Sequence, residues 1–322
     1  TNFRTTPILT HESSPLPTMR PFFTKCLQEP YAYFMAPTDP RILAIHRAST
    51  DYAEGWSGED GVRAHARAKA AEIGCVAMGP GAGSIVRTLA AAIDAKNVVE
   101  IGPGVGSLTT ELAATGANVV AVELDRHLLP VLAETVEPLG VRVVHGDALE
   151  LDWAEVLPAD RVWNLVANLP YNVATTIVLD LLDDVPQIQT MLVMVQREVG
   201  ERLAAGAGDG TYGIPSVKLA LWATASVVAR IPATVFIPQP RVESVMVRIQ
   251  RRSEAIVNVD HDALMDLVRT AFGQRRKMLR RSLSTKVTSE QFEAAGIDPS
   301  DRPERLDIVQ WGALTAAVHA EA

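Results

Sequence analysis

The sequence predicts an α/β fold, in which helices cover both faces of a mostly parallel sheet of about seven strands and a small all-helical domain follows. Between residues 97 and 195, five short apolar and β-branched runs alternate with helical segments, the pattern of a parallel sheet buried on both faces. Two more strand-like runs at 226–231 and 242–249 are expected to form a hairpin that closes the sheet. From about Asp260 the pattern is helical to the end.

Each of the five runs in the first part of the sheet has five or six residues. They are Asn97–Ile101, Val119–Glu123, Val141–His145, Val162–Ala167 and Met191–Val195. We expect a domain built on this sheet over residues 96–255 and a helical domain over 256–322.

The part of the chain before the sheet carries weaker patterns. Residues 1–20 are rich in Thr, Ser and Pro without periodicity, which predicts a disordered lead. Residues 21–95 are predicted to be helical without an assigned fold. Within them, the Ala-rich patterns of 62–93 predict two helices around the glycine loop Gly79–Gly83.

Composition limits the classes of function. The net charge of −8 argues against a protein that coats DNA, so a nucleic-acid partner requires a local basic patch. Cys26 and Cys75 are the only cysteines, which favours a reducing compartment, and we expect the cytoplasm. No apolar run reaches the roughly 18 residues of a membrane span. The seven histidines show no metal-ligand spacing, so we expect no metal and no membrane association.

A glycine-rich turn follows the first predicted strand and precedes a helix. Gly102, Gly104 and Gly106 would let the backbone approach a ligand at the helix N-terminus. A dinucleotide fingerprint requires its third glycine at the place of Ser107, so that fingerprint is not met. The pattern E-x-G-x-G-x-G that starts at Glu100 instead resembles the first motif of S-adenosylmethionine-dependent methyltransferases.

Acidic residues end the next two strands of the predicted sheet. Glu123 lies about twenty residues after the glycine turn, where a carboxylate accepts hydrogen bonds from ribose hydroxyls. The resemblance implies that Asp147, in Gly146–Leu149, accepts from the adenine amino group of the cofactor. Alone, either acid is more often a helix cap. The expected cofactor-binding residues are Glu100, Gly102, Gly104, Gly106, Glu123, Leu124, Asp147, Ala148 and Asn168.

The fourth strand ends in the sequence NLPYN. Pro170 favours an extended Leu169 and has no N–H, which can leave the Leu169 carbonyl unpaired beside the Asn168 side chain. Two acceptors suit an amine with two N–H donors, such as that of adenine, and Tyr171 offers a face for stacking. The predicted catalytic residues are therefore Asn168, Leu169, Pro170 and Tyr171, with an ordinary turn as the alternative.

The chemistry expected of this turn needs no strong base. The lone pair of the amine is delocalised into the purine ring until hydrogen bonds to both protons draw the nitrogen toward tetrahedral geometry. Positioning and electrostatics then supply most of the rate. The target base must first be unstacked and swung into the pocket.

Eight motifs together resemble the small-subunit ribosomal RNA adenine N6,N6-dimethyltransferase family over about residues 97–310. The resemblance implies a Rossmann-like class I methyltransferase that modifies two adjacent adenosines near the 3′ end of 16S rRNA. It also implies S-adenosylmethionine as cofactor, the immature small ribosomal subunit as partner, and a role in ribosome biogenesis; we expect a monomer. The motifs are Val98–Thr109, Ala121–Asp125, Gly146–Leu149, Asn168–Asn172, Met194–Leu203, Tyr212–Lys218, Val235–Ser244 and Ala271–Lys277.

The sequence departs from the family pattern upstream of the glycine turn. Family members carry G-Q-N-F-L about 25 residues before that turn, whereas this chain has IGCVAM at Ile73–Met78. The Ala-rich sequence around it is more similar to the segment that precedes the glycine motif in small-molecule O-methyltransferases. Two alternatives to an RNA methyltransferase therefore stay open, a non-catalytic small-subunit assembly factor and a small-molecule O-methyltransferase.

A cluster of cations lies in the predicted helical domain. Between Leu267 and Ser289 there are seven Lys and Arg and no acid, in a chain that is acidic overall. Arginine forks bind phosphates, so this cluster predicts RNA contact, with a solvated helix face as the alternative. The predicted RNA-binding residues are Arg275, Arg276, Lys277, Arg280 and Arg281; Arg269 and Lys286 complete the seven, and Arg230, Arg241 and Arg248 could extend the surface.

Overall fold

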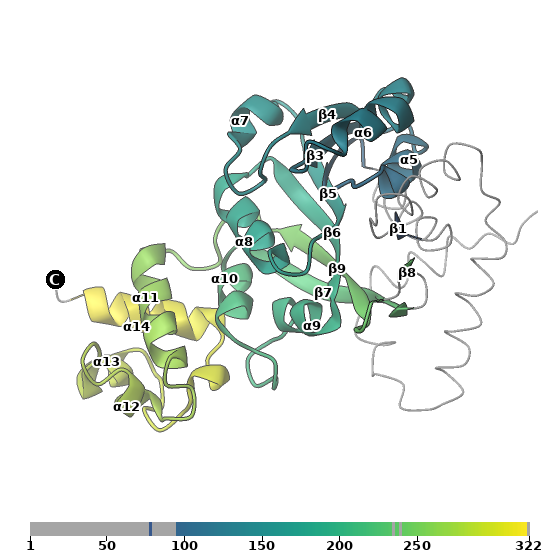
Figure 1. Ribbon diagram of the computed structural model, residues 1–322. Coiled ribbons are helices and arrows are strands. Elements are labelled where there is room, and N and C mark those ends of the chain that lie inside the picture. The colour runs from purple at the N-terminus through teal and green to yellow at the C-terminus, as the bar shows by residue number, and fades with distance from the viewer. Residues whose placement is uncertain (1–76, 79–94, 234–235, 238–239, 321–322) are drawn as a thin grey trace, which may run out of the picture.

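The computed structural model describes residues 77–78, 95–233, 236–237 and 240–320. Their main feature is a seven-stranded sheet in the order β4-β3-β2-β5-β6-β9-β7 (Figure 1). A second sheet has two strands, β1 and β8. Within the described residues, no helix is both long and apolar enough to cross a membrane.

The five predicted parallel strands are confirmed within three residues of their expected bounds. They run side by side and parallel as β4, β3, β2, β5 and β6. Alternate side chains of each strand enter different cores: Val98 contributes to the core beneath α5 and α6, and Val99 to the core beneath α8. This two-sided burial explains why the runs are apolar throughout. The bounds are β2 (Asn97–Ile101), β3 (Asn118–Glu123), β4 (Arg142–His145), β5 (Trp163–Asn168) and β6 (Ile188–Gln196).

The predicted hairpin is also present, as β7 (Ala223–Ile231) and β9 (Ser244–Arg251). The two strands are antiparallel neighbours, and β9 also pairs antiparallel with β6. β9 therefore lies inside the sheet, and β7, which comes before it in the chain, lies at the edge.

One expectation for the N-terminal segment is wrong. Residues 21–95 were predicted to be helical, but β1 (Ala77–Met78) is a short strand that pairs antiparallel with β8 (Phe236–Ile237). Its partner lies far along the chain, and such a backbone ladder leaves no local periodicity. The predictions of a lead at 1–20 and of helices around Gly79–Gly83 lie outside the described residues.

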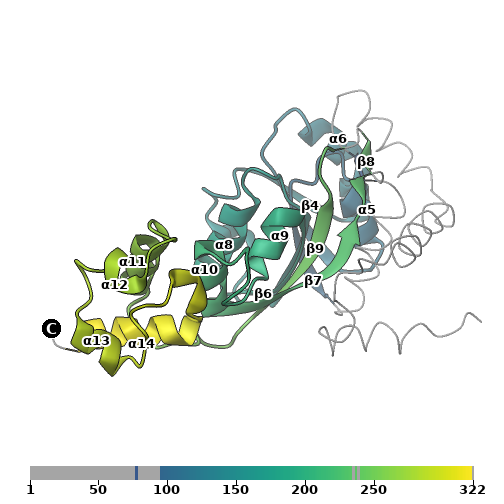
Figure 2. The same cartoon turned by 90° about the horizontal axis from the view of Figure 1, so that it is seen from below.

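Helices cover both faces of the large sheet (Figures 1 and 2). Leu112 and Leu132 bring α5 and α6 onto one face, and Ile177 and Leu219 bring α8 and α10 onto the other. The helices of the first face are α5 (Ser107–Ala113) and α6 (Leu129–Thr135), followed by the 3-10 turn η1 (Glu137–Leu139). Those of the second face are α7 (Trp153–Val156), α8 (Ala174–Asp184), α9 (Arg197–Leu203) and α10 (Ile214–Trp222).

A third core belongs to the C-terminal helices, as predicted from the pattern after Asp260. Trp311 is fully buried there, and the buried Tyr212 hydroxyl donates to the Leu306 carbonyl at 2.9 Å. Because α10 contributes Leu219 to the sheet core and Leu221 to the third core, it joins the two parts. The boundary proposed at residue 256 stays a prediction. The elements are α11 (His261–Phe272), α12 (Leu279–Ser282), α13 (Ser289–Ala294), η3 (Pro303–Arg305) and α14 (Ile308–His319).

Arg251, the last residue of β9, closes the end of α8. Its guanidinium donates to the carbonyls of Leu181, Leu182, Val185 and Ile188 at 2.7–3.1 Å. The last carbonyls of a helix have no partner within the helix. The side chain therefore satisfies the C-terminus of α8 and ties it to the sheet.

Candidate active site

The glycine turn after β2 has the conformation that its sequence predicts. Gly102, Gly104 and Gly106 have φ values of 70°, 60° and 88°, a region that residues with a side chain rarely adopt. At Gly106, which precedes α5, a Cβ would also lie 2.5 Å from Cγ1 of Val136. Gly106 therefore allows α5 to pack against α6, whereas Gly102 and Gly104 line a cavity.

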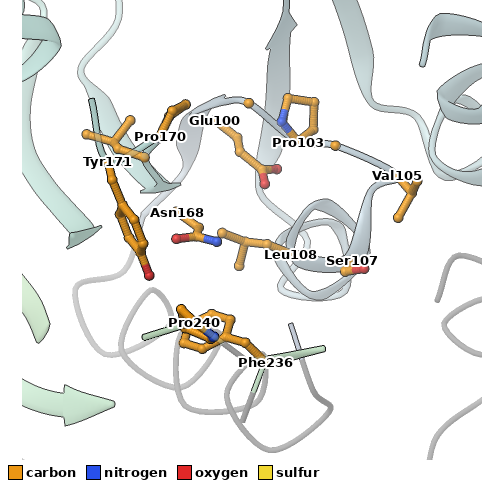
Figure 3. Close-up of a pocket in the computed structure, with 13 residues that line it drawn as sticks. Glu100, Pro103, Val105, Ser107, Leu108, Asn168, Pro170, Tyr171, Phe236 and Pro240 are labelled. Carbon is orange, nitrogen blue, oxygen red and sulfur yellow. The ribbon is translucent and has the colours of Figure 1, made fainter. Parts of the chain in front are cut away.

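The cavity has a volume of about 270 Å³ and lies where three segments meet. The glycine turn, the turn after β5 and the segment from β8 to β9 each supply part of its wall (Figure 3). Parallel strands of an α/β sheet bind ligands at their carboxyl ends, which is where this cavity lies. The lining residues are Glu100, Gly102, Pro103, Gly104, Val105, Ser107, Leu108, Asn168, Leu169, Pro170, Tyr171, Phe236 and Pro240.

Glu100 is the buried acid of this cavity. Its side chain is 1% exposed, and Oε2 has no hydrogen-bond partner among the described residues. Burial raises the pKa of Glu100 to about 8; the Thr109 hydroxyl lowers that pKa and the charge of Glu123 raises it. Figure 3 shows the carboxyl group pointing into the cavity. A cationic ligand group would stabilise the ionised form.

Glu123 has a backbone role that the sequence did not reveal. Its Oε2 accepts from the Gly104 N–H at 3.1 Å and its Oε1 from the Asp125 N–H at 2.8 Å. The carboxylate thus holds the glycine turn against the end of β3. Each carboxylate oxygen can accept a second hydrogen bond, so capacity for a ribose hydroxyl remains.

The other residues predicted to bind the cofactor nucleoside lie at the same edge of the sheet but outside the cavity lining. Asp147 follows β4 and its Oδ1 accepts from the Leu149 N–H at 2.9 Å. Leu124 follows β3 and is 63% exposed. Ala148 lines a separate hollow beside Trp153. The structure thus brings Glu100, Gly102, Gly104 and Asn168 together in one cavity wall, whereas Glu123, Leu124, Asp147, Ala148 and Gly106 do not line that cavity.

The turn after β5 leaves two acceptors free. The Leu169 N–H donates to the Met194 carbonyl at 3.1 Å, which fixes the turn to β6. The Pro170 carbonyl accepts from Val173 and Ala174 and begins α8. In the part of the chain that the structure describes, neither the Leu169 carbonyl nor the Asn168 side-chain amide has a hydrogen-bond partner. Both acceptors belong to residues that line the cavity. The unpaired Leu169 carbonyl agrees with the expectation from Pro170, which has no N–H of its own.

The opposite wall contains residues that sequence reasoning did not assign to the site. Phe236 and Pro240 face Asn168 across the cavity (Figure 3). The Tyr171 hydroxyl lies 2.9 Å from Oγ of Ser244. Phe236, Pro240 and Ser244 all belong to the motif Val235–Ser244, so that motif could have indicated them.

The cationic cluster divides into two kinds of side chain. Arg275 is partly buried, pairs with Glu304 at 3.6 Å and donates to the Gly210 carbonyl at 3.1 Å. Lys286 pairs with Asp266. The remaining four predicted RNA-binding residues are exposed and make no ion pair with a described residue; they are Arg276, Lys277, Arg280 and Arg281. We call these four the basic surface.

Two further findings concern the expected extensions of the site. Arg230 and Arg241 are exposed, whereas Arg248 donates to Oε1 of Gln250 at 3.0 Å. Over the described ranges, no group of three His, Cys, Asp or Glu side chains is arranged to hold a metal ion.

Comparisons with known proteins give the family of the chain. A ribosomal RNA small subunit methyltransferase A of Acidothermus cellulolyticus is 43% identical over 211 residues, which cover 62% of this chain and 71% of that protein. The protein of the same name in Geobacillus kaustophilus is 41% identical over 264 residues, covering 77% of this chain and 82% of the relative.

Solved structures share the fold. A dimethyladenosine transferase from Plasmodium falciparum has a TM-score of 0.61 at 22% identity and covers 72% of this chain and 94% of its own. The 23S rRNA methyltransferase ErmE has a TM-score of 0.57 at 23% identity, covering 73% and 97%. The seven-stranded sheet is therefore that of class I methyltransferases. The profile of the ribosomal RNA adenine dimethylases matches residues 82–317, and the chain belongs to that family.

Proposed function

We propose that this chain transfers methyl groups from S-adenosylmethionine to the N6 amines of two adjacent adenosines near the 3′ end of small-subunit rRNA. The family and the names of its relatives support rRNA adenine dimethylation. One structural observation carries the chemistry: Glu100, with a carboxyl oxygen that has no partner among the described residues, shares a cavity with the acceptors of Asn168 and Leu169, which have none there either.

The residues of the cavity suit this cofactor. When bound, S-adenosylmethionine supplies a methyl group activated by its sulfonium charge. Glu100 offers a buried anion to the cationic amino-acid part of the cofactor, which lowers the pKa of the carboxyl group. Gly102 and Gly104 let the backbone come close to it. Glu123 and Asp147 accept from its ribose and adenine, beside Leu124.

The turn after β5 holds the target adenine. Oδ1 of Asn168 and the carbonyl of Leu169 accept the two protons of the N6 amine, and Tyr171 stacks on the base. These hydrogen bonds draw the nitrogen lone pair out of the purine ring. After one transfer the amine keeps one proton, so one of the two acceptors suffices to orient it for the second.

The basic surface binds the RNA around the target. Arg276, Lys277, Arg280 and Arg281 have no ion pair within the described residues to break before they contact phosphates. These contacts help to offset the cost of unstacking the target base. We propose the immature small ribosomal subunit as the partner.

Labelled S-adenosylmethionine tests the proposal with small subunits that lack these methyl groups. We expect label in dimethyladenosine after digestion of the RNA. Binding to the subunit without label would indicate a non-catalytic assembly factor, and transfer to a phenol but not to RNA would indicate a small-molecule O-methyltransferase. Both results would contradict the proposal.

A further inference from the structure

One hydrogen bond links the two walls of the cavity. Tyr171 stands on the turn between β5 and α8, and its hydroxyl lies 2.9 Å from Oγ of Ser244, the first residue of β9. Ser244 is completely buried, whereas Tyr171 is partly exposed. Figure 3 shows the phenol ring along the cavity wall with its oxygen directed toward the side of Pro240.

Ser244 is held by the sheet on both sides. It pairs in register with Gln196 of β6 and Ile231 of β7. The preceding residue, Glu243, accepts the Arg197 N–H on its carbonyl at 3.0 Å, and its carboxylate bonds the Arg197 guanidinium at 2.8 Å. The backbone of Ser244 is therefore held in place by both neighbouring strands.

Among the described residues, the hydrogen bond to Ser244 holds the end of the Tyr171 side chain. A tyrosine side chain can rotate about χ1 between staggered positions, and this bond favours the position in which it forms. A base stacks well only on a ring whose plane is already set, because ordering the ring on binding would cost conformational entropy. The hydrogen bond selects the plane before the base arrives.

We propose that Ser244 is a positioning residue for the methyl-transfer reaction. Its buried hydroxyl holds the Tyr171 ring in the orientation on which the target adenine stacks. Ser244 acts through Tyr171 and touches neither cofactor nor RNA. This inference rests on the proposed function and adds a residue that sets the placement of its substrate.

Two single variants and their combination test the link. Ser244→Ala and Tyr171→Phe each remove one end of the hydrogen bond and keep the packing. We expect each to lower the single-turnover rate of adenosine methylation about tenfold, the effect of one lost hydrogen bond on a transition state. Affinity for S-adenosylmethionine should stay within about twofold. Because both changes break the same bond, the double variant should be no slower than either single one.

A second measurement follows the base directly. An RNA hairpin with 2-aminopurine at the target position reports entry of the base into the cavity by its fluorescence. We expect less of the stacked-in state with Ser244→Ala and Tyr171→Phe, in proportion to the loss of rate. A purely structural role for the serine would lower thermal stability without changing this fluorescence.

The matched control is Ser216→Ala. Ser216 is also a buried serine, but its hydroxyl bonds the Gly213 N–H and the Arg202 carbonyl, away from the cavity. This variant should lose stability and keep the rate per folded molecule. The inference is overturned if Ser244→Ala methylates at the wild-type rate, or if the two single losses multiply in the double variant. Wild-type protein that methylates no adenosine would instead refute the proposed function, and the inference with it.

Discussion

The two ends of the sheet differ in how their charged groups are partnered. At the cavity end, Glu100 is buried with one oxygen unpartnered within the described residues, and the acceptors of Asn168 and Leu169 have no partner there either. At the other end, Arg251 donates to four carbonyls and closes α8. Both residues lie in strands of the same sheet, so a charged side chain in a strand is not by itself a sign of a binding group.

The number of hydrogen-bond partners distinguishes Glu100 from Arg251. An unsatisfied buried polar group costs free energy in the folded protein, and such a cost is tolerated where a ligand removes it. A satisfied one contributes to stability and leaves nothing for a ligand. Changes at the cavity end should therefore affect function more than stability, and changes at the Arg251 end should do the reverse.

The largest effect is expected at Asn168. Asn168→Ala removes one acceptor of the target amine and should lower the methyl-transfer rate about 1,000-fold, in the range of losing one preorganised group. Cofactor affinity and thermal stability should change little. Single-turnover assays measure the methyl-transfer rate, isothermal titration measures the affinity for S-adenosylmethionine, and thermal unfolding measures the stability. Asn118→Ala, at the exposed far end of β3, is the control; a large loss of cofactor affinity at Asn168 would show that its role is misassigned.

Next in size is the loss of stability with Arg251→Met. This change removes one donor from each of four carbonyls at the end of α8 and the start of β6, of which those of Leu181 and Val185 keep a backbone donor. It should lower the unfolding free energy by about 2 to 3 kcal/mol. Denaturant titration measures it. The buried Nε of the neighbouring Arg252 has no hydrogen-bond partner among the described residues, so Arg252→Met should cost much less. Equal losses would remove the contrast between the two ends.

The basic surface should give a smaller effect on binding. Replacing Arg276, Lys277, Arg280 and Arg281 by Ala should weaken RNA binding about 30-fold at low salt and reduce the slope of log K against log salt by roughly 3 to 4. Filter binding at several salt concentrations gives both values.

Two matched variants sharpen this experiment. Arg161→Ala changes an exposed cation outside the surface and should leave the slope unchanged. Arg275→Ala breaks the contacts with Glu304 and Gly210, so it should lower stability slightly and affect the slope less than any member of the surface. An unchanged slope in the fourfold variant would refute the RNA assignment.

The smallest effect on binding is expected at Glu100, whose charge depends on pH. Its pKa is raised from 4.5 to about 8 in the folded protein, so the folded state keeps a proton that the unfolded chain releases. Stability of the ligand-free protein should therefore fall as pH rises from about 4.5 to 8 and level off above, by a few kcal/mol at most. Thermal unfolding between pH 5 and 9 measures the trend.

Glu100→Gln should remove this dependence and weaken cofactor binding about tenfold at pH 8, where the bound cation holds the wild-type carboxylate in its ionised form. Wild-type affinity for S-adenosylmethionine should increase from pH 6 to pH 8, because the bound cation favours the charged form. Glu134→Gln, an exposed acid of α6, is the control. A wild-type affinity independent of pH would contradict a buried anion as the partner of the cofactor.

Local pattern predicted much of the fold and of the site. The strands from Asn97 to Gln196 are runs rich in apolar and β-branched residues, of which all but the edge strand β4 are largely buried, and each carries its signature within a few residues. The glycine turn and the turn at Asn168–Tyr171 were predicted for the same reason, since positive φ and a missing N–H are properties of single residue types.

Contacts between distant residues were not predictable in this way. The place of β9 between β6 and β7, the pairing of β1 with β8 and the bond between Tyr171 and Ser244 each join segments that are far apart in the sequence. Arg275 and Arg276 are adjacent and chemically alike, yet Arg275 pairs with Glu304 and Arg276 makes no ion pair with a described residue.

The sequence by itself therefore determined the strands, the turns and the kinds of side chain at their ends, because these depend on the conformational preferences and chemistry of neighbouring residues. Only the tertiary structure decided which of those side chains have partners. Hydrogen bonding and burial depend on what the rest of the chain brings to each atom. For this reason Arg251 has four acceptors, whereas an oxygen of Glu100 has no partner among the described residues.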